Sequence, residues 1–162
     1  MEIKKISRLS IFLALGVSLN ILESFIPIFN GYIPGFKLGL ANIVSLYVLY
    51  KFSLKDALYL GILRVLLVSI LRTGLFSTYF FFSLSGVILS IIMMYIGKNY
   101  FKLSVIGVSI LGSIFHSIGQ IIIAIILLHF NIIYYLPWLL IISIPSGILT
   151  GIISNKLIKQ YW

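Results

Sequence analysis

The stretch KDALYLGILRVLLVSILR, from Lys55 to Arg72, places one permanent cation, Arg64, in the middle of an otherwise apolar segment. In a helix that rises 1.5 Å per residue, Arg64 lies roughly 13 Å from each charged end, near the centre of a hydrocarbon layer about 30 Å thick. A charged group at that depth costs from about 2.5 to well above 10 kcal/mol, so it generally faces a partner or a cavity. Arg64 is therefore the first candidate functional residue.

The composition on either side of this stretch is that of an integral membrane protein. Of the 162 residues, 61% are hydrophobic and 9% are charged, whereas about a quarter of the residues in a soluble domain are charged. We expect one domain, residues 1–162, embedded in the lipid bilayer. The net charge of +9 would suggest nucleic acid in a soluble protein. Here the cations stand singly or in pairs between apolar runs, so they are expected to set the topology and no nucleic-acid partner is predicted.

The apolar runs predict an all-α membrane protein with six transmembrane helices. Five runs are long enough to cross a bilayer, which takes about 20 residues. The second run is short and reaches only ~20 Å, so the loop before it is expected to enter the membrane. The predicted segments are 8–26, 38–50, 54–71, 78–96, 104–128 and 135–154.

The lysines and arginines predict that both termini are cytoplasmic, because cytoplasmic loops carry an excess of these residues. With the amino terminus inside, Lys37 and Arg72 fall on the outer side, and Arg64 belongs to neither side. The remaining cations fall on the cytoplasmic side: Lys4, Lys5, Arg8, Lys51, Lys55, Lys98, Lys102, Lys156 and Lys159.

The first segment carries a polar face in its outer half. Gly16, Asn20, Glu23 and Pro27 recur at intervals of four, three and four, so they share one side of a helix. Glu23 is the acid that lies away from the cytoplasmic side, and it is the natural partner for a cation such as Arg64. This face predicts either a binding site or a structural ion pair.

The loop NGYIPGFKLGLAN, from Asn30 to Asn42, is a second candidate locus. It places Lys37 beside the start of the second helix, and a helix amino terminus next to a cation is a ready anion site. Half-buried helix starts serve this purpose in transporters. The alternative is a tight connection whose lysine extends to the membrane surface.

The fifth segment adds a stripe of small and polar residues in which His116 and Gln120 lie one turn apart. A pocket role and a packing role for His116 both remain open. Metal binding is not expected, because the chain has two histidines, no cysteine and one suitably placed acid. No cofactor is predicted.

These candidates share a depth, the midplane or outer half of the membrane, and they carry three cations against one acid. We therefore predict a site for an anionic or polar small molecule that enters from outside. The predicted site comprises Asn20, Glu23, Lys37, Asn42, Arg64, Arg72, His116 and Gln120.

The motifs GFKLGLANIV, LRTGLFS and GSIFHSIGQ, together with the six-segment layout, resemble a bacterial membrane family known as Gx transporters. That family is also named heptaprenyl diphosphate synthase component I. It is similar in turn to the substrate-binding S-components of energy-coupling factor (ECF) transporters. The resemblance implies a multi-pass protein of the bacterial cell membrane that captures a micronutrient outside and docks on a membrane coupling subunit driven by two ATPases.

The first segment is a candidate docking surface for the coupling subunit, because Ser10, Ala14 and Ser18 recur at steps of four. Small residues so spaced let another helix approach closely in a membrane. The spacing is similar to the alanine motif with which S-components dock, although serine stands at two of the three places. Packing within the bundle is the alternative.

The synthase name implies an enzyme component, which the residues allow only in a non-catalytic role. Prenyl chain elongation needs aspartate-rich motifs to hold magnesium, and this chain has one aspartate, Asp56. It also lacks the phosphate-binding motif of ATPases. The alternative function is therefore a non-catalytic membrane component of heptaprenyl diphosphate or quinone metabolism.

Overall fold

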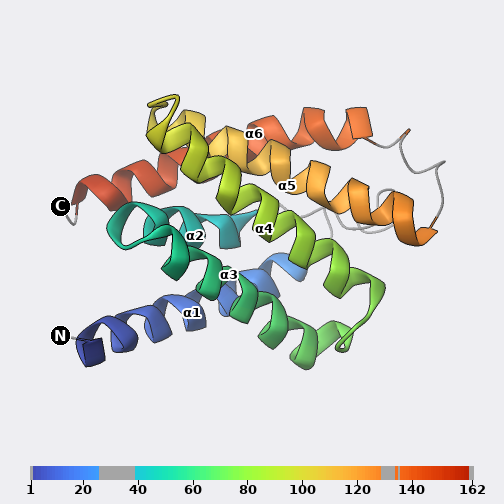
Figure 1. Ribbon diagram of the computed structural model, residues 1–162, viewed down its shortest axis with the longest axis horizontal. Coiled ribbons are helices and arrows are strands. Elements are labelled where there is room, and N and C mark those ends of the chain that lie inside the picture. Colours follow the sequence, from blue (N-terminus) through green and yellow to red (C-terminus); the bar gives the residue numbers. More distant parts are fainter. Residues whose placement is uncertain (1, 26–38, 129–133, 135, 161–162) are drawn as a thin grey trace.

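The computed structural model describes residues 2–25, 39–128, 134 and 136–160, and the elements in these ranges are helical (Figure 1). Each of the six apolar segments contains an α-helix, but the first helix begins at Glu2 and not at residue 8, and the last ends at Gln160 and not at residue 154. The elements are α1 (Glu2–Ser24), α2 (Leu40–Lys51), α3 (Leu54–Val68), the π-helix η1 (Ser69–Thr73), α4 (Thr78–Asn99), α5 (Val105–Leu128) and α6 (Leu136–Gln160).

Four helices, α1, α4, α5 and α6, are long and apolar enough to cross a membrane by length and composition, and α2 is a shorter apolar helix. The chain therefore has the helices of a multi-pass membrane protein. The third segment differs from its predicted full-length span. Its α-helix ends at Val68, and the chain continues as a π-helix in which the Gly74 N–H donates to the Ser69 carbonyl at 2.7 Å.

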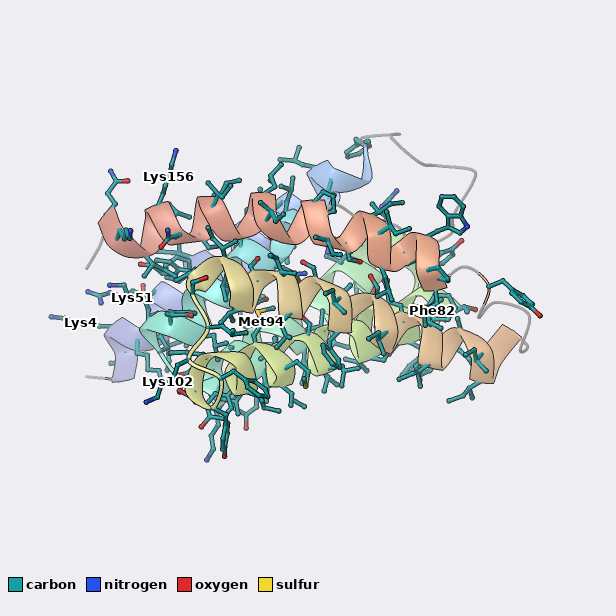
Figure 2. The ribbon with its side chains drawn as sticks, turned by 90° about the horizontal axis from the view of Figure 1, so that it is seen from above. Lys4, Lys51, Phe82, Met94, Lys102 and Lys156 are labelled. Atoms are coloured by element: carbon teal, nitrogen blue, oxygen red, sulfur yellow. The ribbon has the colours of Figure 1, made fainter. Side chains whose placement is uncertain are left out.

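Both termini lie at the same end of the bundle (Figure 1). Four lysines from separate segments, Lys4, Lys51, Lys102 and Lys156, gather at this end, and Phe82 lies toward the opposite end (Figure 2). This arrangement agrees with the predicted alternation of inner and outer loops. We call this end the lysine end.

The short helix α2 is the centre of the packing, because it contacts α1, α3, α4, α5 and α6. Its residues 41–46 are all buried, as are Val48 and Leu49. At the lysine end, Lys98 Nζ of α4 donates to the Leu49 carbonyl at 3.0 Å. A cation there also stabilises the negative end of the α2 dipole.

Glycines let α4, α5 and α6 approach closely. A Cβ added at Gly119 of α5 would lie 2.8 Å from the Ser85 carbonyl oxygen of α4. A Cβ added at Gly147 of α6 would lie 2.7 Å from the Ile110 Cα of α5. Hydrogen bonds between hydroxyls cross the same interface, as in the Ser109–Thr150 pair at 2.8 Å. Small residues and hydroxyls are the usual means of helix association in lipid.

In contrast, α1 is peripheral and contacts only α2 and α3 within the described ranges. An ion pair of 2.8 Å between Lys5 Nζ and Asp56 Oδ1 connects its lysine end to the start of α3. Ser10, Ala14 and Ser18, the predicted docking residues, are all exposed. None of the three is therefore buried by the helices of the described bundle.

Candidate functional site

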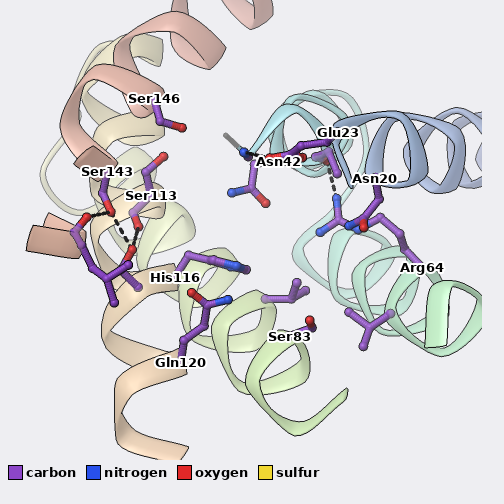
Figure 3. Close-up of a pocket in the computed structure, with 16 residues that line it drawn as sticks. Asn20, Glu23, Asn42, Arg64, Ser83, Ser113, His116, Gln120, Ser143 and Ser146 are labelled. Carbon is purple, nitrogen blue, oxygen red and sulfur yellow. Dashed lines mark hydrogen bonds between the residues drawn. The ribbon is translucent and has the colours of Figure 1, made fainter. Parts of the chain in front are cut away.

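A polar cavity lies between the helices, and all six α-helices or their caps contribute to its wall (Figure 3). Five of its 16 lining residues lack a polar side chain: Gly39, Ala41, Val65, Val87 and Leu139. The other lining residues are Asn20, Glu23, Asn42, Arg64, Ser83, Ser113, His116, Ser117, Gln120, Ser143 and Ser146. A polar cavity inside an apolar bundle is costly to form without a function, so it is the leading candidate site.

Arg64 of α3 is the most unusual residue of the wall, because it is a permanent cation with only 2% of its surface exposed. One guanidinium nitrogen, Nη1, donates to the Ala41 carbonyl in the first turn of α2. The Nε N–H makes no hydrogen bond to any described residue. Gly16 of α1 provides room for the side chain, since a Cβ there would lie 3.2 Å from Arg64 Cδ.

Glu23 supplies the opposing charge from the last turn of α1, and it is 5% exposed. Its carboxylate attracts the Arg64 guanidinium, and its Oε1 accepts a hydrogen bond of 2.5 Å from the Gly39 N–H. Gly39 is the N-cap of α2 and has a φ of 77°, in the left-handed region that favours glycine. At the start of this helix, where the sequence predicted an anion site, the Gly39 N–H therefore faces the Glu23 carboxylate.

The wall facing these charges is neutral and comes from α4, α5 and α6 (Figure 3). His116 packs on Gly86 of α4, where an added Cβ would lie 2.9 Å from the ring carbon Cε1. Ser117 and Ser143 form a hydrogen bond of 2.6 Å across the α5–α6 interface. The cavity therefore has a charged side and a side of hydroxyl, amide and imidazole groups.

The size of the cavity limits what it holds in this conformation. Its volume is about 40 Å³, which is enough for about three water molecules. It fits the charged or polar end of a ligand, and a larger molecule requires the helices around the cavity to separate. Among the described residues there is no group of three or more His, Cys, Asp or Glu side chains that could hold a metal ion.

The sequence pattern of the family described as heptaprenyl diphosphate synthase component I matches residues 12–157, from α1 to the last turns of α6. The chain belongs to this family. A comparison with curated proteins gives no match. The residues matched by the pattern of the heptaprenyl diphosphate synthase component I family include every residue of the cavity wall.

Six of the eight predicted site residues come together in the cavity of this family member. Arg72 lies in η1, is exposed and does not line the cavity. Lys37 lies outside the described residues. Among the described residues, the wall carries one cation, Arg64, and one acid, Glu23. The six residues that come together are Asn20, Glu23, Asn42, Arg64, His116 and Gln120.

Sequence reasoning missed the contribution of α6, where Ser143 and Ser146 line the cavity. The available signal was the series Ser143, Ser146, Thr150 and Ser154, which repeats at three, four and four residues and is buried throughout. Ser83 of α4 and Ser117 of α5 were also missed as wall residues.

Proposed function

We propose that this chain is a substrate-binding subunit of the bacterial cell membrane, similar to ECF S-components, that captures an anionic or polar small molecule from the extracellular side for transport. The observation that carries this proposal is the burial of Arg64 at the wall of a polar cavity. A cation is expensive inside a membrane protein, and such residues commonly mark substrate pathways.

The position of the cavity supports entry from outside. Asn20 and Glu23 lie in the last turns of α1, and α1 starts at the lysine end. Gly39 and Asn42 belong to the start of α2, which runs back toward that end and finishes at Lys51. With the lysine end in the cytoplasm, the cavity belongs to the outer half of the protein.

In this proposal, Arg64 neutralises a negative or polar group of the ligand, Glu23 holds the cation in place, and Lys37 adds a second positive charge. The neutral wall supplies directional hydrogen bonds through His116, Gln120 and Asn42. Arg72 takes no part in this arrangement, because it is exposed outside the cavity.

Native mass spectrometry of the purified protein in mild detergent is the first test, since it identifies a molecule that co-purifies. Affinity for that molecule is then measured in Arg64→Ala and in the matched control Arg72→Ala. We expect Arg64→Ala to weaken binding by at least about tenfold, since hydrogen bonds to charged groups contribute about 1.5–3 kcal/mol. Equal affinities of the two variants would refute the site.

We further propose that α1 docks on a membrane coupling subunit driven by two ATPases. Ser10, Ala14 and Ser18 are exposed along a helix that contacts only α2 and α3 in the described ranges. In lipid, such a small-residue face favours close contact with another helix. Pull-down of a candidate coupling subunit by wild-type protein and by Ala14→Leu tests this role.

The family description supports a second candidate, a non-catalytic component of heptaprenyl diphosphate or quinone metabolism. A catalytic role is disfavoured because Asp56 is engaged in an ion pair with Lys5 and in a 2.6 Å hydrogen bond from the Ser53 hydroxyl. The test is to mix the purified protein with a soluble subunit that carries aspartate-rich motifs. Restored prenyl transferase activity would favour this candidate over transport.

A further inference from the structure

The start of α2 is a built oxyanion site that already contains a carboxylate. The Gly39 N–H donates to Glu23 Oε1 at 2.5 Å, and Arg64 reaches the same turn through the Ala41 carbonyl. The backbone N–H groups of a helix start and the positive end of its dipole both favour a negatively charged oxygen. α2 has 12 residues, so this end carries a developed dipole.

A second observation points to a ligand at this place. The Nε N–H of Arg64 is buried and has no hydrogen-bond partner among the described residues, while the side chain as a whole is 2% exposed. A buried donor on a cation is costly to leave unsatisfied, by about 1–3 kcal/mol or more. An acceptor oxygen of a bound molecule would satisfy it.

We propose that Glu23 is an internal stand-in for the ligand, and that a carboxylate or phosphate group of the ligand replaces the Glu23 carboxylate at the Gly39 N–H and Arg64. This inference rests on the proposed binding function and deepens it in two ways. It assigns the ligand an oxyanion group, and it makes Glu23 a competitor for the site as well as a counter-ion.

The space in the cavity and its charge both favour a ligand that replaces the Glu23 carboxylate over one that binds beside it. The cavity has room for about three water molecules, and Glu23 with 5% exposure is already inside it. A second negative group beside a buried carboxylate would be repelled strongly, because electrostatic interactions are weakly screened away from water. Glu23 stands one residue before the end of α1, so its side chain can turn away toward that end of the bundle.

Chemical rescue tests the proposal. Glu23→Ala removes the carboxylate, and sodium propionate or sodium phosphate is then added to the purified variant, with sodium chloride at equal ionic strength as reference. Propionate supplies the missing carboxylate, and phosphate probes the other oxyanion. We expect at least one of them to raise the Tm of Glu23→Ala by about 3 °C or more, a readily measured shift for a chain of this size. We expect no such rise for wild-type protein.

Asp56→Asn is the matched control, since it removes one negative charge from an acid that does not line the cavity. Rescue by propionate alone assigns a carboxylate ligand, and rescue by phosphate alone assigns a phosphate ligand. If neither anion stabilises Glu23→Ala, or if Asp56→Asn responds equally, the stand-in role is wrong.

Glu23→Gln is the second variant in case Glu23→Ala does not fold, because its amide oxygen still accepts from the Gly39 N–H. A neutral amide is displaced more easily than a carboxylate, so the anions are expected to stabilise Glu23→Gln more than wild-type protein. An equal response of the two proteins would contradict the proposal. Failure here leaves the Arg64→Ala binding result unaffected, so the two proposals are judged separately.

Discussion

Replacing Arg64 by methionine should destabilise the protein strongly, and replacing Glu23 by glutamine in the same chain should restore most of the loss. Methionine keeps an unbranched apolar chain in place of the aliphatic part of arginine and removes the cation. The Glu23 carboxylate, 5% exposed, would then be a buried charge without the guanidinium that attracts it. Glutamine removes that second charge and still accepts a hydrogen bond from Gly39.

The expected magnitude follows from the burial of both groups. Leaving one of two opposite buried charges without the other costs up to about 3–5 kcal/mol, whereas replacing both charges is often nearly neutral. The Gly39 N–H and the start of α2 still stabilise Glu23 in the single variant, so we expect a loss near 3 kcal/mol. For 162 residues this corresponds to a Tm about 6–12 °C lower, and the double variant should recover more than half of that decrease.

Thermal unfolding of the purified proteins in one detergent is the assay, with helix content followed by circular dichroism. Arg72→Met is the control, because Arg72 is exposed and its loss should change stability by less than about 0.5 kcal/mol. The reasoning would be refuted if Arg64→Met were as stable as Arg72→Met, or if adding Glu23→Gln lowered the Tm further.

Three other predictions concern packing and docking. Gly147→Ala should lower the stability of the protein by about 1–3 kcal/mol, because the added Cβ would lie 2.7 Å from the Ile110 Cα. Thermal unfolding measures this loss, and an unchanged Tm would contradict the close α5–α6 contact. Lys5→Gln should cost less than about 1 kcal/mol in the same assay, since Lys5 is 47% exposed in its ion pair with Asp56; a larger loss would assign that pair a structural role. Ala14→Leu should change the stability by less than about 0.5 kcal/mol, because Ala14 is exposed, and it should abolish pull-down of the coupling subunit. Undiminished pull-down would exclude this face of α1 as the docking surface.

The helices could be predicted from the sequence because a bilayer fixes both the length of an apolar run and the side on which lysines accumulate. The exception is the third segment, where the backbone changes from α to π hydrogen bonding at Ser69. The hydropathy of the sequence does not reveal this change in hydrogen bonding, because the third segment stays apolar through Leu71. The length of an apolar run alone therefore overstated the α-helical part of this segment.

Part of the site was predictable for an energetic reason. Glu23 and Arg64 are expensive in a membrane, so their presence alone marks them. Serines give a weaker signal, because a hydroxyl can bond within its own helix; the Ser143 hydroxyl does so with the Leu139 carbonyl at 2.6 Å. The contribution of α6 to the wall was missed for this reason.

The contact between Glu23 and Gly39 could not be derived from spacing, because it joins residues 16 positions apart on two different helices. The sequence indicated an anion site at the start of α2, and it indicated an acid on α1. That the acid fills the site depends on how the two helices pack. The same uncertainty applied to Arg72, which stands at the end of an apolar run and is exposed on the surface.

An experimental structure of the protein with its co-purified molecule tests the central claim most directly, namely that the charged and neutral walls of the cavity together bind a small molecule. The account predicts density for that molecule between Arg64 on one side and His116 on the other. Density elsewhere, with the cavity closed by the protein's own side chains and Arg64 still donating to the Ala41 carbonyl, would contradict it.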